Sequence, residues 1–251
     1  MKARIPLLSL TSTICFFILW EAIVRFGLAP AALPSPSGVL YALYEVSGTL
    51  PTHVAHSLLH FAAGYLSAAT VAIPLGMLAG WYAPARKALE PIIEFFRPIP
   101  PIAWIPFALL AFAGYFEASA FIIFVGAFFP LFTNTYTGFR DTPVSYVEVV
   151  KSLGADQLQI LRRVALPSAL PQIFTGIRIA LGVGWMCVIA AEMFVPYGLG
   201  WAIIQMRYLH DIRAVMAYMF IIGALGFAME RTAKLIELKL FRWQRGLVVG
   251  V

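Results

Sequence analysis

The chain has 251 residues, of which 61% are hydrophobic and 12% charged, and its mean hydropathy is +0.85. Soluble domains carry roughly 25% charged and 45–50% apolar residues, so this composition excludes an ordinary soluble domain and predicts an all-α polytopic membrane protein. The basic residues behind the net charge of +6 are scattered between apolar runs, which argues against nucleic-acid binding and for membrane orientation. Cys15 and Cys187 lie inside apolar runs without a CxxC partner, so neither a disulfide nor a metal pair is predicted.

The first apolar run covers residues 7–24 and follows two basic residues. A secretory signal peptide begins in the same way, and Ala29-Pro30-Ala31 resembles a cleavage site. The run is long for a signal core, however, and it is followed by Arg25 and a proline-rich segment. We therefore favour a retained first span over a cleaved signal.

Further apolar runs predict about six transmembrane helices in all, because a bilayer-crossing helix needs about 20 apolar residues. A short amphipathic helix is expected over Val39–Val46, a short loop over 81–91, and an outer loop or half-inserted segment over 196–212. The sequence contains no recognisable soluble domain or convincing repeat, so residues 1–251 are expected to form one transmembrane domain. The expected spans are approximately 7–25, 56–80, 92–113, 118–137, 171–195 and 213–232.

The third expected span is interrupted by prolines at 98, 100, 101 and 106. A proline removes a backbone donor and clashes with the preceding turn, so this span must be kinked or partly unwound. Within a bilayer, irregular backbone persists only where it is buried in protein or lines a cavity. Pro100 and Pro101 are therefore candidates for the wall of a translocation path.

The positions of the basic residues predict the orientation of the chain. With six spans and both termini in the cytoplasm, thirteen Lys and Arg residues lie on the inner side and three on the outer side, a strong positive-inside bias. The inner set is Lys2, Arg4, Arg86, Lys87, Arg140, Lys151, Arg162, Arg163, Arg231, Lys234, Lys239, Arg242 and Arg245, and the outer set is Arg25, Arg207 and Arg213.

The longest polar interval in the chain is residues 145–167, SYVEVVKSLGADQLQILRRVALP, which the charge pattern assigns to the cytoplasm. We call it the coupling segment. Ser145 and Glu148 stand three apart, as the partners of a capping box do. Gly154 is suited to end this first short helix in a left-handed cap.

A second short helix is expected to follow within the coupling segment. Asp156 and Gln159 repeat the capping-box spacing, and Leu166-Pro167 is expected to close the helix. These residues alone leave two interpretations open. The segment is either a cytoplasmic loop with two surface helices or a lever on which another protein pushes.

The sequence contains no HExxH, GxSxG or glycine-rich phosphate loop, so no catalytic set is predicted. If the chain were part of a pump, it would need a nucleotide site on another protein. His53, His56 and His60 share a helical face that is compatible with a metal ion. No carboxylate or cysteine stands near them in the sequence to complete four ligands. An ordinary interfacial helix surface is therefore favoured over a metal site.

Charged residues within the spans are costly in lipid, so they pair with each other or face a cavity. Glu94 and Arg97 are three apart, and a pair on one helix face is the favoured interpretation. Arg178 is expected to have a partner at the cytoplasmic boundary, and Glu192 to line a gate or bind the Gly198–Gly200 backbone. Both remain candidates for the path, as does Asn134 in the polar inner end of the fourth span.

The coupling segment resembles a known motif. It reads Glu148-Val149-Val150, three residues, Gly154, nine residues, then Val164-Ala165-Leu166-Pro167. The "EAA" loop of ABC-importer permeases reads Glu-Ala-Ala, three residues, Gly, nine residues, Ile, one residue and Leu-Pro. The spacing is intact and every replacement is small and apolar. The chain is thus identified as similar to these permeases.

Three further segments, 33–36, 90–106 and 191–200, resemble the nitrate/sulfonate/taurine/bicarbonate branch of the same permeases. The resemblance implies a type I importer (MetI-like) fold in a bacterial inner membrane, with a homodimer of permeases, two cytoplasmic ATPase subunits and an extracytoplasmic solute-binding protein. ATP and Mg would be bound by the ATPase, and this chain would hold no cofactor. The implied ATPase-coupling residues are Glu148, Val149, Val150, Lys151, Gly154, Ala155, Leu166 and Pro167.

The cargo implied by the resemblance is a small oxyanion such as nitrate, an alkanesulfonate, taurine or bicarbonate. A vitamin precursor of the thiamine or riboflavin type is an alternative, because some close relatives are assigned to these. A secondary transporter or channel that acts alone is a rival of another class. It predicts inverted repeats and midplane acid–base pairs, and neither is evident in the sequence.

Overall fold

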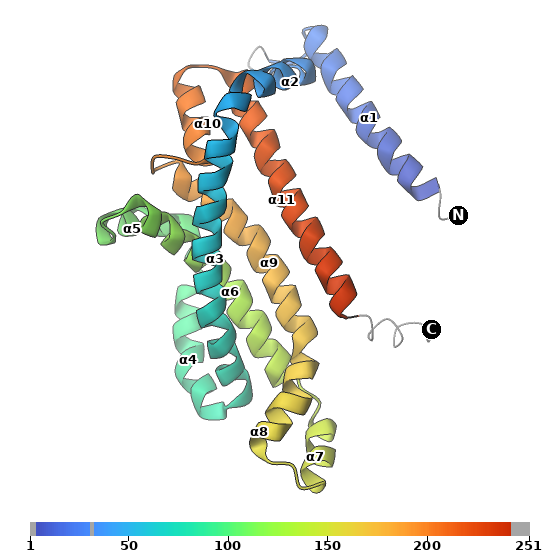
Figure 1. The fold of residues 1–251 in the computed structure, drawn as a ribbon, viewed down its shortest axis with the longest axis vertical. Coiled ribbons are helices and arrows are strands. Elements are labelled where there is room, and N and C mark those ends of the chain that lie inside the picture. The colour runs from blue at the N-terminus through green and yellow to red at the C-terminus, as the bar shows by residue number, and fades with distance from the viewer. Residues whose placement is uncertain (1–3, 31–32, 242–251) are drawn as a thin grey trace.

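The computed structural model describes residues 4–30 and 33–241 as an elongated bundle of helices, without strands in these ranges (Figure 1). A π-helical turn covers Leu161–Ala165, and 3-10 turns cover Val46–Gly48 and Pro101–Trp104. The α-helices are α1 (Arg4–Arg25), α2 (Pro36–Glu45), α3 (Leu50–Trp81), α4 (Ala83–Phe96), α5 (Ile105–Ala111), α6 (Tyr115–Arg140), α7 (Val144–Ser152), α8 (Gln157–Ile160), α9 (Leu166–Glu192), α10 (Leu199–Tyr208) and α11 (Ile212–Leu240).

The centre of the bundle is formed by α3, α6 and α9, which pack along one another. The small residues of α3 permit this close approach, as their spacing indicates. A Cβ added at Gly64 would lie 2.5 Å from the carbonyl oxygen of Ala120, and one added at Gly80 would lie 2.6 Å from that of Tyr136. The two helix backbones are therefore as near as a glycine allows.

Four helices are long and apolar enough to cross a membrane: α3, α6, the continuous helix over 157–192, and α11. A fifth span results if α4 and the helical turns over Pro101–Ala111 are counted as one element, bent by 86°. The expected kink at the prolines is thereby confirmed. The α1 helix occupies the first expected range without being among these candidates, so the count of six spans stays a prediction.

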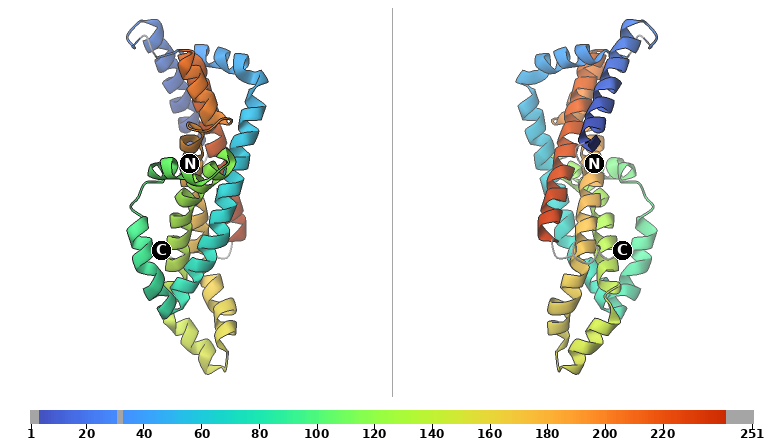
Figure 2. Two further views of the ribbon diagram at one scale, coloured as in Figure 1. Left: turned by 90° about the vertical axis from the view of Figure 1, so that its left-hand side faces the viewer. Right: turned by 90° about the vertical axis from the view of Figure 1, so that its right-hand side faces the viewer.

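The expected loop over 81–91 is wrong, because α4 begins at Ala83. Tyr82 is extended and ends α3. Pro84 then lies in the first turn of α4, where a backbone N–H has no partner within the helix, so proline loses no hydrogen bond there. In Figure 2, α4 stands beside the bundle and is joined to α5 by an extended connection. Residues 196–212 likewise contain a helix, α10, and the last helix continues to Leu240.

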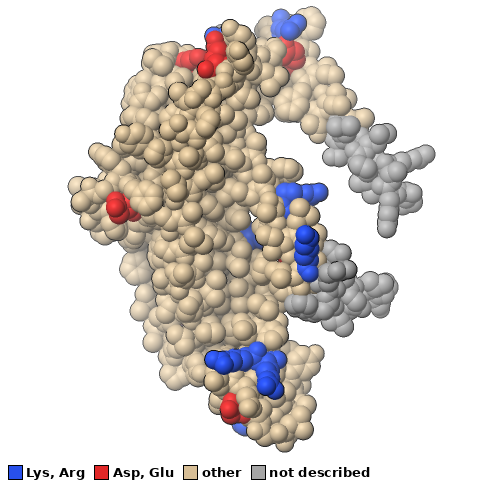
Figure 3. Space-filling model, in the orientation of Figure 1, with Lys and Arg blue, Asp and Glu red and all other residues tan. Residues whose placement is uncertain are grey.

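On the face shown in Figure 3, basic side chains gather at the end of the molecule formed by α7 and α8 and near the lower part of α11. Elsewhere on this face charged side chains are few, as a lipid-facing surface requires. Three of the basic residues used to predict the orientation, Lys2, Arg242 and Arg245, lie outside the described residues, as does Ala31 of the cleavage-like tripeptide. The side chain of Arg4 is also not described.

Candidate functional site

The first helix of the coupling segment, α7, begins without a side-chain cap. The expected capping box of Ser145 and Glu148 is wrong, because Pro143 occupies the N-cap position. The carbonyl oxygen of Pro143 accepts hydrogen bonds from the N–H groups of Tyr146 (3.1 Å) and Val147 (3.5 Å). Ser145 therefore lies inside the first turn, where its hydroxyl is not placed to cap the helix.

The end of α7 is the left-handed cap that the sequence predicts. Gly154 has φ +82°, and its N–H donates to the carbonyl oxygen of Lys151 at 3.0 Å. The N–H of Ala155 donates to the carbonyl oxygen of Val150 at 3.3 Å. These two bonds form a Schellman motif, which satisfies the last carbonyl groups of α7 and turns the chain sharply toward α8.

The start of α8 confirms the second capping box. The N–H of Gln159 donates to Asp156 Oδ1 at 2.7 Å, and the N–H of Asp156 donates to Gln159 Oε1 at 3.1 Å. The expected helix end at Leu166-Pro167 is wrong, because the chain continues through the π-helical turn into α9. The N–H of Leu166 reaches back five residues to the carbonyl oxygen of Leu161, and a wider turn of this kind lets a helix accommodate a nearby proline.

The α7 helix has no buried residue, and the coupling segment and its flank present large apolar side chains to the surroundings. Leu153 is 81% exposed. Apolar side chains gathered at an exposed tip are typical of a docking surface for another protein. The exposed large apolar residues are Val144, Tyr146, Val149, Leu153, Leu158 and, further from the tip, Leu166.

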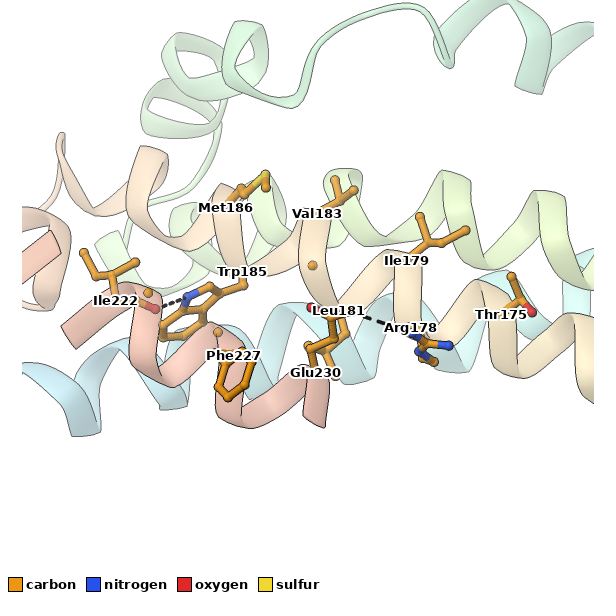
Figure 4. A pocket seen from close by; sticks show the side chains of 13 residues that line it. Thr175, Arg178, Ile179, Leu181, Val183, Trp185, Met186, Ile222, Phe227 and Glu230 are labelled. Carbon is orange, nitrogen blue, oxygen red and sulfur yellow. Dashed lines mark hydrogen bonds and ion pairs between the residues drawn. The ribbon is translucent and has the colours of Figure 1, made fainter. Parts of the chain in front are cut away.

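Arg178 has carboxylate partners in the C-terminal part of α11, and the sequence interpretation favoured such a partner over a role in the path. Its Nη1 donates to Glu237 Oε2 at 2.8 Å, and its Nη2 lies 3.7 Å from Glu230 Oε1. Figure 4 shows Arg178 and Glu230 at one end of a largely apolar cavity of about 710 Å³ between α9 and α11. Further along, the indole N–H of Trp185 donates to the carbonyl oxygen of Ile222 at 3.1 Å.

Glu192 is fully buried at the other end of α9 and holds together three parts of the chain. Ser57 Oγ donates to its Oε2 at 2.7 Å, and His60 Nδ1 lies 2.8 Å from its Oε1. The N–H of Gly200 also donates to Oε2, at 3.0 Å, and the N–H of Leu199 donates to Ser57 Oγ at 2.9 Å. The expected hydrogen bond from Glu192 to the glycine-rich loop is confirmed. We call these five residues the Glu192 cluster.

The sequence interpretation missed Ser57 and His60 as partners of Glu192. Their position three apart on one face of an apolar helix could have indicated a buried polar site. The carboxylate that they bind, however, is more than 130 residues away in the sequence. The three histidines do not converge on a metal site: no group of three potential His, Cys, Asp or Glu ligands occurs among the described residues. His56 instead stacks on Tyr197.

Two of the candidate path residues, Pro101 and Asn134, line one cavity of about 320 Å³ between α6, α9 and the connection that follows α4. The side-chain amide of Asn134 donates to the carbonyl oxygen of Pro130 at 2.8 Å and accepts from Gln172 Nε2 at 3.0 Å. Pro100, Arg178 and Glu192 do not line this cavity. The structure therefore separates the candidate path residues into three places.

Arg97 lines the same cavity, although the sequence interpretation paired it with Glu94. No ion pair joins these two side chains in the part of the chain that the structure describes. The proline-rich connection begins directly after Arg97, because its N–H makes the last bond of α4, to the carbonyl oxygen of Ile93. The end of the helix turns Arg97 toward the cavity shared with Asn134.

Comparison with known proteins connects these features. Residues 72–242 match the family model described as "Binding-protein-dependent transport system inner membrane component". A putative ABC transporter permease protein of Methanocaldococcus jannaschii is 37% identical over 236 residues, covering 91% of this chain and 88% of that protein. The bicarbonate transport system permease protein of Synechocystis sp. is 36% identical, covering 86% and 82%. The taurine transport system permease protein of Escherichia coli is 31% identical, covering 93% and 88%.

Solved structures show the same fold. An inward-facing methionine ABC transporter structure superposes with a TM-score of 0.59 at 20% sequence identity, covering 80% of this chain and 93% of that chain. A second crystal form of that transporter gives a TM-score of 0.58, covering 82% and 98%. The chain therefore belongs to the family of binding-protein-dependent transport system inner membrane components and is the permease subunit of an ABC importer.

Proposed function

We propose that this permease carries a small oxyanion, of the class of bicarbonate, nitrate, taurine or another alkanesulfonate. The observation that carries the proposal is the similarity to permeases named for bicarbonate and for taurine, which extends over 86% and 93% of the chain. Both cargoes present oxygen atoms with negative charge. The cavity lined by Arg97 and Asn134 has the matching chemistry, because it offers one cationic group and an amide.

We further propose that separate ATPase subunits drive transport from the cytoplasmic side and bind the ATP and Mg. The coupling segment would bind the ATPase through α7, which carries Glu148 and Lys151, and through the turn at Gly154. The full set of proposed coupling residues is Glu148, Val149, Val150, Lys151, Gly154, Ala155, Leu166 and Pro167. The exposed apolar side chains of the segment support this role, and so do its two hydrogen-bonded caps, which make a short helix stiff enough to transmit force.

The proposed assembly contains two copies of this chain, two ATPase subunits and one extracytoplasmic solute-binding protein. Both termini would lie in the cytoplasm, together with the basic end of the molecule, in accord with the positive-inside rule. The six expected spans would then place α2 and α10 at the extracytoplasmic end, where the binding protein delivers the oxyanion. ATP-driven movement of α7 would tilt α6 and α9, between which it is connected, and so alternate access to the cavity.

The proposal is tested by reconstituting the permease in proteoliposomes with the ATPase and binding protein encoded beside it. Uptake of labelled bicarbonate, nitrate and taurine is measured with and without ATP, and a thiamine precursor and a riboflavin precursor serve as comparison cargoes. We expect ATP-dependent uptake of at least one oxyanion. Uptake of a vitamin precursor alone would refute the oxyanion assignment, and uptake without any ATPase would refute the ABC mechanism.

A further inference from the structure

Arg97 and Thr133 are shared by two cavities of the structure. One is the cavity of about 320 Å³ described above, and the other, of about 90 Å³, is lined by residues of α3, α4 and α6 and by the start of the connection after α4. No other residue lines both. Arg97 and Thr133 therefore stand where the two cavities adjoin.

The guanidinium of Arg97 is without a hydrogen-bond or ion-pair partner among the described residues, and no other ionisable side chain lines the larger cavity. Glu90 and Glu94 line only the smaller cavity, together with Arg86 and Arg97. A charge inside a bilayer costs about 2.5–3.5 kcal/mol on insertion scales unless it is paired or hydrated. An unpaired arginine at a cavity wall is thus prepared to receive an anion.

Two neutral donors stand near this position. Thr133 makes no side-chain hydrogen bond within the described part of the chain, so its hydroxyl is available. Asn134 donates one amide hydrogen to the carbonyl oxygen of Pro130, which leaves the second for a solute. The opposite walls are apolar, with Phe129 and Val183 among them. A low-polarity wall strengthens a charge-assisted hydrogen bond, because it lowers the local dielectric constant.

From these contacts we infer that Arg97 is the residue that binds the oxyanion as it crosses the permease, with the Thr133 hydroxyl and the Asn134 amide as additional donors. This inference rests on the proposed function. A guanidinium presents two parallel N–H groups, which match two oxygen atoms of a carbonate, nitrate or sulfonate group. A cavity of about 320 Å³ also leaves room for water around an anion of this size.

Arg178, the arginine that the sequence indicated for this role, is a weaker candidate. Its guanidinium already has two carboxylates within 4 Å, Glu237 and Glu230. An anion arriving there would have to displace them or be repelled by them. The two arginines therefore differ in the one respect that decides anion binding, which is whether their charge is already compensated by the protein.

The test uses the complete transporter in proteoliposomes and compares Arg97→Gln, Arg97→Lys and Lys87→Gln. Lys87 lies on the same helix, is exposed and lines neither cavity, so its substitution is a matched control for loss of one positive charge. We expect Arg97→Gln to lower the initial uptake rate by about tenfold or more, which corresponds to losing one charge-assisted contact. Arg97→Lys should keep part of the rate with a raised KM, because lysine retains the positive charge but lacks the two parallel N–H groups of the guanidinium. Lys87→Gln should match the unmodified protein.

Co-purification with the ATPase is measured for each variant and should be unchanged. Basal ATPase activity is measured for Lys87→Gln and should also be unchanged. If Arg97→Gln does not assemble, Arg97→Lys decides: wild-type KM and rate in that variant would overturn the inference. Equal uptake by Arg97→Gln and the unmodified transporter would also overturn it, while leaving oxyanion transport established. Absence of oxyanion uptake by the unmodified transporter would instead refute the proposed function itself.

Discussion

The Glu192 cluster and the coupling segment differ in whether their side chains find partners within this chain. In the Glu192 cluster, one carboxylate that is fully buried meets a hydroxyl, an imidazole and a backbone N–H, all supplied by this chain. In the coupling segment, the backbone of α7 and α8 is capped locally, but its apolar side chains remain exposed. The polar groups of the first region are all paired within the chain, whereas the second region leaves apolar surface exposed, which the proposed ATPase would cover.

This difference indicates what each region contributes. Buried polar groups that lose a partner destabilise the fold itself, because no water replaces the lost bond. Exposed apolar groups cost the isolated permease little and gain their stabilisation on docking. Substitutions in the Glu192 cluster should therefore lower the stability of the permease, whereas substitutions in the coupling segment should weaken its association with the ATPase. The following predictions test that separation.

The largest effect is expected for Glu192→Ala. The substitution leaves Ser57, His60 and the Gly200 N–H without their buried acceptor, and we expect a loss of roughly 3–5 kcal/mol in the free energy of unfolding. Thermal unfolding of the detergent-solubilised permease measures it. Glu45→Ala is the matched control, because Glu45 is exposed at the end of α2. Equal stability of the two variants would show that the cluster does not hold the fold together.

The next effect is expected for Gly154→Val. The left-handed conformation of Gly154 costs a branched residue about 1–2 kcal/mol, although the space around it is open. We expect stability to change little while affinity for the ATPase, measured by co-purification or titration, falls about tenfold. Gly27 has φ +70° and equally open surroundings at the end of α1, so Gly27→Val imposes the same backbone strain elsewhere. A similar loss of affinity in that control would contradict a specific role for the turn.

A comparable or smaller effect is expected for Leu153→Ser, which removes an exposed apolar side chain from the end of α7. If Leu153 is buried on docking, its loss should weaken ATPase binding by about 1–2 kcal/mol and leave thermal unfolding unchanged. Leu209→Ser is the control, because Leu209 is 69% exposed after α10, far from α7. Unaltered ATPase affinity in Leu153→Ser would mean that this part of α7 stays exposed in the complex.

The sequence predicted the features whose chemistry is local. The Asp156–Gln159 box and the Gly154 turn depend on residues a few positions apart, and both occur as expected. Two predictions failed where local signals compete. The N-cap of α7 is Pro143 and not Ser145, and the helix does not end at Pro167, because a π-helical turn precedes it and continues into α9.

Pairings that depend on the packing of distant helices could not be predicted from the sequence. Glu192 meets Ser57 and His60 only because α3 and α9 lie side by side. Arg97 and Glu94 line one small cavity without forming an ion pair in the described part of the chain. Arg178 is the partial exception. A cytoplasmic partner was expected for it from the cost of a charge in lipid, but the identity of Glu237 required the structure.

The smallest effect is expected for Asp156→Ala, and it bears most directly on the comparison. Asp156 caps α8 through bonds that lie within four consecutive residues, so its loss should cost about 1 kcal/mol locally. Because α8 continues into α9 without a break, global unfolding should hardly change. The coupling segment would fray more often, and the ratio of transport to ATP hydrolysis should fall by a few-fold, while Asp156→Asn, which keeps an acceptor for the Gln159 N–H, should preserve it. A global loss of stability in Asp156→Ala as large as that in Glu192→Ala would mean that the coupling segment, too, belongs to the folded core, and the distinction between the two regions would not hold.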